Sequence, residues 1–202
     1  MDINANQWEC IEEIVKERED GIDYTMRIRI VHLKGKIGVI DSYNGIIVEP
    51  ELDYIGPFVY SKVVRKDNFW KSEEKIKYAL IMKDNKYGYI NELGEIMVEP
   101  IWDNISAFVN QTYAYVTKLG KYGLIDMTGK VLIEPSYDYI GQCFGSKYFW
   151  VRDSGKYGLI TSERIIVEPK FEMVRPFKDG KSMVFLNGQW SYMDSSGNLS
   201  YL

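Results

Sequence analysis

The stretch Gly120-Lys121-Tyr122-Gly123-Leu124-Ile125-Asp126, closed by Ile133-Glu134-Pro135, decides the fold because it recurs along the chain. A recurrence of this kind indicates a repeat architecture, in which each copy is one structural unit. The other full copies contain Gly38, Gly88 and Gly158 at the position of Gly123 and end at Pro50, Pro100 and Pro169, and a fifth, partial copy contains Ser191 at that position.

The spacing within the copies is regular. The interval from the inner glycine to the proline is 12, 12, 12 and 11 residues. After each proline follow an aromatic or apolar residue, an acid and an aliphatic residue, as in Tyr137-Asp138-Tyr139-Ile140. Successive inner glycines are 35 residues apart, except that Gly38 and Gly88 are 50 apart. The first unit therefore carries an insertion, which we place at residues 61–77.

Each copy has the pattern of a three-stranded antiparallel meander. A strand such as Tyr113 to Lys118 meets Leu119-Gly120, a turn dipeptide of the kind that accepts positive φ, and returns as the glycine-containing strand. A second turn leads to a third strand, which we expect to end at the Glu-Pro pair because proline cannot donate to a sheet ladder. The inner glycine weakens its strand unless something packs close to it. One meander buries too little surface to be stable alone, so neighbouring units must share a core.

The predicted fold is therefore all-β, with four full units, a partial fifth and a short N-terminal capping helix. Residues 5–20 favour the helix, since Trp8, Ile11, Ile14 and Val15 form an apolar stripe and Gly21 can end it. We expect this helix to cover the open edge of the first unit, or alternatively to bind a partner. The domain prediction is an acidic N-terminal cap over 1–24 and a β-repeat domain over 25–202.

Composition restricts the function classes. The chain has 46% hydrophobic and 14% aromatic residues and a net charge of −4, and residues 1–24 contain eight acids against two bases. The remainder is near neutral, which does not demand a nucleic-acid partner. No apolar run approaches the length of a membrane span, and the first residues lack the features of a secretion signal, so we expect a cytoplasmic protein. Cys10 and Cys143 are expected to be free thiols.

The recurring Gly-Lys-Tyr-Gly-Leu-Ile-Asp, Glu-Pro and aromatic-Asp pattern resembles the WG repeat family over about residues 34–197. It departs from the family where Ile37 replaces the aromatic residue and where Ser191 follows Trp190 in place of glycine. The resemblance implies a bacterial, all-β, interaction-type protein, and it brings no catalytic residues with it.

We find no pattern that predicts catalysis, and we expect no enzyme activity, no cofactor and no metal. Phosphate-binding glycine motifs are missing, and the single His32 lies in a strand pattern, which leaves no basis for a zinc site or a catalytic triad. Carboxylates recur in every unit, as glycosidases would require, but a residue present in every unit is expected to serve the repeat. We assign these acids to turn hydrogen bonding and solvation. Lysines recur at the turns, either for solubility or as a basic stripe.

The insertion is the candidate binding site. Residues 61–77 contain six bases and three acids around two adjacent aromatic residues. Exposed aromatic residues among cations suit a protein hot spot or base stacking, whereas the alternative is an extended hairpin whose tryptophan packs on the body. The candidate binding residues are Arg65, Lys66, Phe69, Trp70 and Lys71.

The function favoured by these features is a non-catalytic protein-binding module, either a scaffold or an inhibitor or immunity protein that acts on another macromolecule. One alternative is an inhibitor of a nucleic-acid-guided defence nuclease, of anti-CRISPR type, that contacts RNA or a basic channel. Another is a carbohydrate-binding, lectin-like module that stacks sugars on tyrosines. The partner is expected to be a protein, with nucleic acid possible through the basic insertion.

Overall fold

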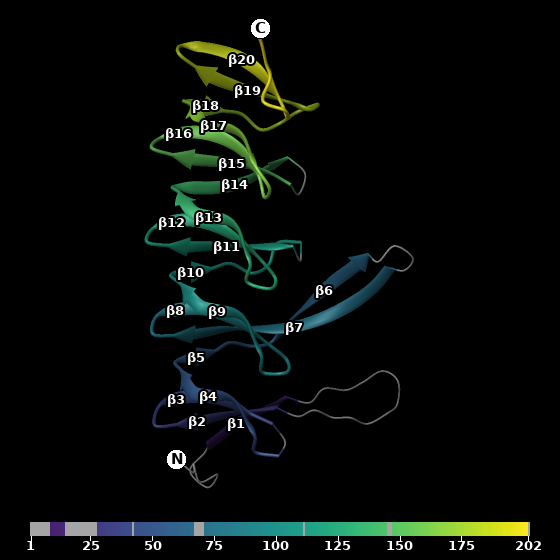
Figure 1. The fold of residues 1–202 in the computed structure, drawn as a ribbon, viewed down its shortest axis with the longest axis vertical. Helices are drawn as coiled ribbons and strands as arrows, with labels where there is room; N and C mark the ends of the chain where they lie inside the picture. The colour runs from purple at the N-terminus through teal and green to yellow at the C-terminus, as the bar shows by residue number, and fades with distance from the viewer. Residues whose placement is uncertain are drawn as a thin grey trace. The chain divides into compact units, whose positions relative to one another are not determined.

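The computed structural model describes residues 9–14, 28–41, 43–66, 71–110, 112–144 and 147–201. The chain divides into two compact units. Unit 1 contains Met1–Thr112 and Met127–Gly129, and unit 2 contains Tyr113–Asp126 and Lys130–Leu202. Both units are built from antiparallel β-sheets, as the repeat pattern predicts (Figure 1).

Unit 1 contains two complete sheets. The first has the order β1-β2-β3-β4, and the second has the order β5-β7-β8-β9 with β6 paired to β7 alone. The strands are β1 (Glu9–Ile14), β2 (Ile28–Leu33), β3 (Lys36–Ile40), β4 (Ile46–Leu52), β5 (Tyr54–Ile55), β6 (Val59–Lys66), β7 (Lys71–Lys83), β8 (Lys86–Asn91), β9 (Ile96–Trp102) and β10 (Asn104–Ile105).

Unit 2 begins with three successive antiparallel strands, β11, β12 and β13, and continues with the sheets β14-β15-β16-β17 and β18-β19-β20-β21. The bounds are β11 (Tyr113–Lys118), β12 (Lys121–Asp126), β13 (Val131–Tyr137), β14 (Tyr139–Phe144), β15 (Tyr148–Asp153), β16 (Lys156–Thr161), β17 (Ile165–Phe171), β18 (Met173–Val174), β19 (Lys181–Leu186), β20 (Gln189–Asp194) and β21 (Leu199–Tyr201). The predicted meander is thus confirmed in all four full repeats and in the partial fifth repeat.

The first turn of each meander is a two-residue turn with positive φ at both positions. Leu119 and Gly120 have φ of 53° and 76°, and Ser154 and Gly155 have 49° and 79°. Such turns follow the right-handed twist of the flanking strands and so join β11 to β12 and β15 to β16 closely.

The inner glycines have a steric cause. In the β12–β13 pair, Tyr122 faces Tyr137 and Leu124 faces Ile133, so Gly123 alone lies opposite three residues of the other strand. The extra residues bulge toward it, and a Cβ on Gly123 would lie 2.6 Å from the Ile133 carbonyl oxygen. The expectation that something packs close to this glycine is confirmed, and the close neighbour is the backbone of the Glu-Pro segment.

This bulge also corrects the predicted end of the third strand. The strand continues past its proline to the aromatic or apolar residue before the acid, as β13 does past Pro135 to Tyr137 and β4 past Pro50 to Leu52. Proline is accommodated because it lies in the bulge, where no ladder hydrogen bond is required of it.

A second correction concerns the number of strands in a sheet. The residues after the acid form a further strand that pairs with the first strand of the following meander, as β14 does with β15 and β18 with β19. Each complete sheet therefore has at least four strands, because the linker uses its backbone groups to cover an edge that would otherwise be open.

The predicted N-terminal helix is wrong for the residues that can be compared. Glu9–Ile14 form β1, which pairs with β2 and has a register irregularity between Cys10 and Glu12, while the other residues of the 5–20 range lie outside the described residues. An extra residue breaks the two-residue alternation of a strand, so a bulged strand is compatible with apolar residues three apart. Ile11 and Ile14 have this spacing, which is also the spacing that suggested a helix. The strand β1 thus covers the edge of β2, which is the role that we predicted for a helix in this segment.

Each unit has a core between its sheets. In unit 1, Val39 and Leu52 of the first sheet cluster with Ala79, Ile81 and Ile90 of the second. In unit 2, Trp150 and Phe171 of one sheet cluster with Val184 and Met193 of the next. The apolar faces of successive sheets therefore bury one another within each unit, as expected for repeats that are too small to fold alone.

Candidate functional site

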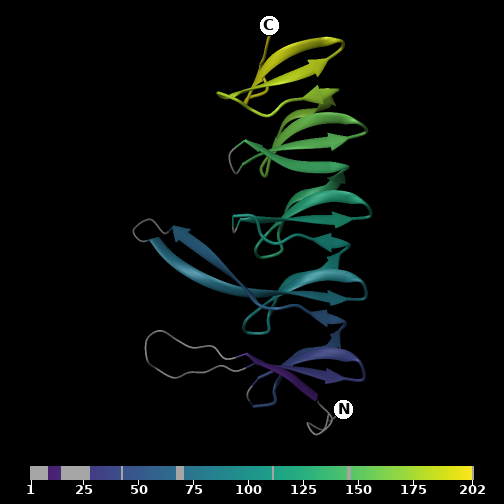
Figure 2. The same cartoon turned by 180° about the vertical axis from the view of Figure 1, so that it is seen from behind.

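The insertion forms a two-stranded ribbon. Strand β6 pairs with the first part of β7 over eight consecutive positions, from Val59 opposite Tyr78 to Lys66 opposite Lys71. Figures 1 and 2 show this hairpin extending away from the sheets of unit 1. Among the strands that the structure describes, β6 pairs only with β7, so its outer edge is open along its length.

The base of the hairpin is anchored by three aromatic rings. Tyr78 is 5% exposed, and its ring centroid lies 5.0 Å from that of Tyr89 and 5.3 Å from that of Phe108. The Tyr89 hydroxyl donates to the Ser106 carbonyl oxygen at 2.9 Å, and burial raises the pKa of Tyr89 to about 12. The base of the ribbon is therefore held in place by buried aromatic packing within unit 1.

The structure places the predicted binding residues as follows. Arg65 and Lys66 lie at the end of β6, and Lys71 begins β7. Lys66 and Lys71 are directly opposed in the register, and Arg65 is opposite Ser72. Phe69 and Trp70 lie outside the described residues. The extended-hairpin interpretation of the insertion is thus confirmed for its backbone.

The recurring acids have a structural role at the turns. Asp138 accepts a hydrogen bond from Lys121 Nζ at 2.6 Å and another from the Ser154 backbone N–H at 3.0 Å. Asp53 likewise accepts from Lys36 and from the Asp84 backbone N–H. Each carboxylate therefore links the second strand of its own meander to the first turn of the following one. The prediction that these acids serve turn hydrogen bonding is confirmed.

These contacts shift the titration of both partners. The hydrogen bond from Lys121 holds the pKa of Asp138 below its usual value, and the Ser154 backbone N–H lowers that pKa further. In the other direction, the hydrogen bond to Asp138 raises the pKa of Lys121. The charged form of each group is therefore the stable one in the folded protein.

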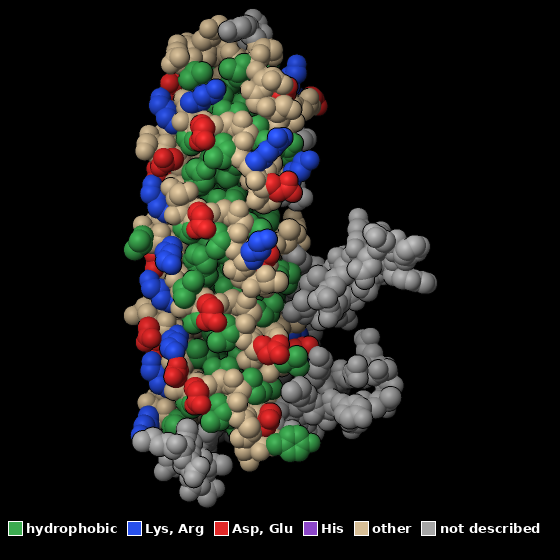
Figure 3. Space-filling view, viewed as in Figure 1, with side chains coloured by type: hydrophobic (Ala, Val, Ile, Leu, Met, Phe, Trp, Pro, Cys, Tyr) green, Lys and Arg blue, Asp and Glu red, His purple; other side chains and the backbone are tan. Residues whose placement is uncertain are grey.

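The same pairing weakens the idea of a basic stripe. The turn lysines form ion pairs with acids of their own unit, as in Lys86 with Asp103 and Lys156 with Glu172. The glutamates before the prolines, such as Glu168, are exposed. On the face seen in Figure 3, acidic side chains stand singly among hydrophobic ones. Much of the lysine charge at the turns is thus already neutralised.

Unit 2 contains a groove that the sequence did not predict. It has a volume of about 540 Å³ and lies where the sheet β14–β17 meets the segment after β18. Its lining includes Tyr139, Trp150, Arg152, Tyr157 and Arg175. This size is within the range of small-ligand sites, and the lining combines aromatic faces with two cations.

Arg152 lies in the middle of an aromatic row. The register places it opposite Tyr139 of β14 and opposite Tyr157 of β16, so the three residues share one face of the sheet. Its guanidinium carbon lies 5.7 Å from the centroid of the Tyr157 ring. Tyr139 in turn covers Gly141, where a Cβ would lie 2.8 Å from the tyrosine Cζ, and it remains 49% exposed.

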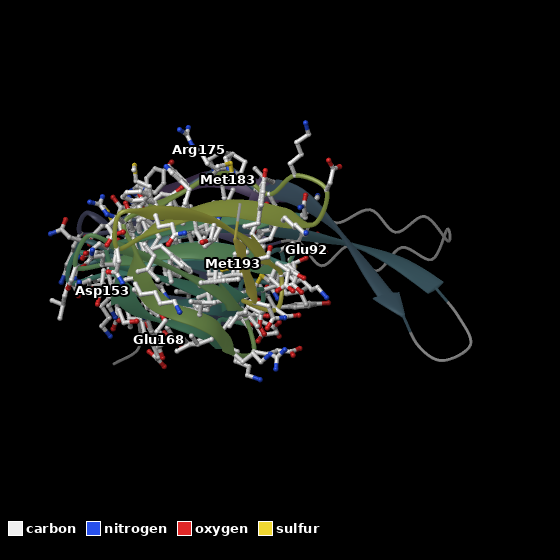
Figure 4. All side chains as sticks on the ribbon, turned by 90° about the horizontal axis from the view of Figure 1, so that it is seen from above. Glu92, Asp153, Glu168, Arg175, Met183 and Met193 are labelled. Carbon is white, nitrogen blue, oxygen red and sulfur yellow. The ribbon has the colours of Figure 1, made fainter. Side chains whose placement is uncertain are left out.

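Arg175 is fixed through its backbone. Its N–H donates to the Met183 carbonyl oxygen at 2.9 Å, and the buried Ser182 hydroxyl donates to its carbonyl oxygen at 2.6 Å. Its guanidinium carbon lies 5.8 Å from the centroid of the Trp190 ring. Arg175 and Met183 lie on one side of unit 2, and Glu168 lies on the opposite side (Figure 4).

A sequence signal for the groove exists, but it lies in departures from the repeat. The positions equivalent to Arg152 in the other meanders hold His32, Met82, Thr117 and Phe185. The positions equivalent to Arg175 hold Gly56, Ser106 and Gly141. A search for recurring residues passes over such positions. Comparing each unit with the pattern, position by position, would have found both arginines.

Two further observations concern the described residues only. No group of three or more His, Cys, Asp or Glu side chains in that part of the chain could hold a metal ion. Nor does that part contain a helix of the length and hydropathy needed to cross a membrane.

Comparison with known proteins agrees with the repeat. No curated protein matches the chain. The WG containing repeat family matches residues 37–70, 87–122, 122–157 and 161–190, and each match begins within the second strand of one of the first four meanders. These four matches cover most of the chain, and the chain belongs to the WG containing repeat family.

Proposed function

We propose that this chain is a non-catalytic binding module that captures another protein through the β6–β7 hairpin. The observation that carries the proposal is the open edge of β6, which is eight residues long and paired on one side only among the described strands. An open edge presents unpaired N–H and C=O groups, which can bind an extended segment of a partner as an additional strand.

The position of the hairpin within the repeat supports the same function. The same contacts of glycine, acid and lysine residues recur in successive repeats. These contacts stabilise the fold, and they do not distinguish one repeat from another. The hairpin is the large departure from that period, and departures of this size tend to be functional. Its anchoring on Tyr78 reduces the entropy that a partner must remove on binding.

The finer function is that of a scaffold or of an inhibitor or immunity protein. Residues 61–77 are rich in bases, so an inhibitor of a nucleic-acid-guided nuclease that contacts guide RNA is a second form of the proposal. Both forms use the hairpin as the contact surface, and they differ in whether the partner surface is protein or phosphate.

The experiment is affinity capture from the native host with two variants. In the first, residues 60–77 are replaced by Asn-Gly, so that a two-residue turn connects Val59 to Tyr78. Val59 and Tyr78 already face each other in the β6–β7 pair, and a turn of this length can therefore close the hairpin. The second combines Phe69→Ala and Trp70→Ala. We expect the replacement to abolish capture of the partner and the double substitution to weaken it.

A matched control keeps the hairpin and alters an equally exposed turn. Leu119→Asn changes a residue that is 89% exposed at the first turn of another meander, and it is expected to leave capture unchanged. Capture of the same partners by the hairpin-replaced variant contradicts the proposal, provided that its thermal unfolding stays cooperative.

A further inference from the structure

Unit 2 contains a second hollow beside the groove already described. It has a volume of about 480 Å³ and is lined by residues that include Lys178, Lys181, Met183 and Tyr192. Arg175 and Pro176 line both hollows. The two hollows therefore adjoin at Arg175 and Pro176, and together they form what we call the basic groove, defined by Tyr139, Arg152, Tyr157, Arg175, Lys178, Lys181 and Tyr192.

The cations of the basic groove are not neutralised as the turn lysines are. Among the described residues, no carboxylate lies within ion-pair distance of Arg152, Arg175, Lys178 or Lys181. Two acids also line the hollows: Asp179, and Asp138, which is bound by Lys121 and whose pKa is lowered further by the charge of Arg152. The groove thus carries an excess of positive charge in a chain whose net charge is −4.

Two of these cations are held close together by the backbone. Lys178 and Lys181 exchange backbone hydrogen bonds of 2.8 and 3.0 Å across the Asp179-Gly180 turn, so they are directly opposed. Like charges in directly opposed positions destabilise a sheet. Opposed lysines also occur at another turn, where Lys83 pairs with Glu51 and Lys86 with Asp103. Lys178 and Lys181 have no such carboxylate among the described residues, so an anion between them would relieve the repulsion.

The arginines are held by aromatic rings rather than by acids. Arg152 lies over Tyr157 and Arg175 over Trp190. A guanidinium over a ring is oriented by that contact, while the N–H groups in its plane stay free to donate. Both arginines are thereby prepared to bind oxygens of a phosphate or carboxylate.

Exposed tyrosines accompany the cations along the groove. Tyr139 is 49% exposed and rests on Gly141, and Tyr192 is 38% exposed in the second hollow. Ring faces that stay exposed beside a cationic track are what proteins use to stack successive bases of a single strand. An acidic peptide would use the cations and leave the tyrosine faces without a role.

From these contacts we infer that the basic groove of unit 2 binds single-stranded nucleic acid, with phosphates on Arg152, Arg175, Lys178 and Lys181 and bases on Tyr139 and Tyr192. This site is separate from the β6–β7 hairpin, which belongs to unit 1. Loss of one activity does not entail loss of the other, and the two proposals are tested by different variants.

The test is a fluorescence anisotropy titration of the full chain with labelled oligo-dT and oligo-U of about 12 nucleotides. We expect binding that weakens steeply between about 50 mM and about 200 mM salt. Arg175→Gln should reduce the slope of log affinity against log salt by about 0.7, as expected when one phosphate contact is lost. Tyr139→Leu should weaken binding about tenfold through the loss of stacking.

Arg164→Gln is the matched control, since Arg164 is exposed in unit 2, and lines neither hollow. It removes the same charge and should leave affinity and salt slope nearly unchanged. Oligoglutamate of the same length serves as the competing ligand class. No binding at low salt, equal loss in Arg164→Gln, or equal binding of oligoglutamate with no effect of Tyr139→Leu would each overturn the inference.

Discussion

Gly123 has room for a hydrogen atom and nothing larger. A Cβ there would lie 2.6 Å from the Ile133 carbonyl oxygen and 2.8 Å from the Pro135 nitrogen, and both of these atoms belong to backbone that cannot rotate away. The glycine of the repeat is therefore required by close approach and not by its φ. The same argument holds for Gly88 and Gly158, which face the same Glu-Pro bulge.

We expect Gly123→Ala to lower the free energy of unfolding by about 2 kcal/mol, because the Glu-Pro backbone must shift to admit the methyl group. Urea denaturation monitored by circular dichroism measures this change. Gly155→Asn is the matched control: Gly155 has φ of 79° with open space around it, and asparagine tolerates that conformation. Equal stability of the two variants would show that the close approach does not limit the residue at position 123.

Leu119 is the opposite case, a side chain in a conformation that suits it poorly. It has φ of 53°, and its side chain is 89% exposed, so little apolar surface is buried at this left-handed position. We expect Leu119→Asn to raise the free energy of unfolding by about 1 kcal/mol. A thermal melt that shows no increase would mean that the leucine side chain contributes stabilisation not visible in its exposure.

At the scale of one element, an acid after the third strand joins neighbouring meanders, as Asp53, Asp138 and Glu172 do. Asp138 binds Lys121 of its own meander and the Ser154 N–H of the next turn. Because these contacts lower the pKa of Asp138 below the ordinary value of 3.8, they stabilise the folded protein above that pH. The stabilisation is lost as the pH falls through the lower, folded-state value.

We therefore expect Asp138→Asn to lose less stability than the wild type on acidification below about pH 5. The amide oxygen can still accept from Ser154, so the fold is retained while the titrating group is removed. The measurement is the free energy of unfolding in urea at a series of pH values. Parallel curves for the two proteins would show that Asp138 does not contribute to acid destabilisation.

The strands could be predicted at this scale because turns and alternation repeat in every copy. The strand β14 and its equivalents could not, because the pairing of the linker with the next meander depends on a neighbour that the local pattern does not contain. The same holds for β1, whose residues have an apolar spacing that both a helix and a bulged strand satisfy. Tertiary pairing decided between the two.

For the whole molecule, the repeat supplies a platform and the departures from it supply the candidate sites. The insertion was recognisable in advance because it lengthens one period, and its backbone is the predicted hairpin. The basic groove was not recognisable, since Arg152 and Arg175 change side chains without changing the period. A repeat pattern thus predicts the fold well and conceals functional substitutions of this kind.

Hydrogen exchange along β6, compared between the free chain and its complex with the captured partner, tests the role of the hairpin most directly. In the free chain, the amides that face β7 should be protected and every second amide, which faces the open edge, should exchange rapidly. If the partner binds as an added strand, the rapidly exchanging amides of Val59–Lys66 become protected. Unchanged exchange in β6, with new protection appearing elsewhere, would contradict the assignment of binding to the hairpin.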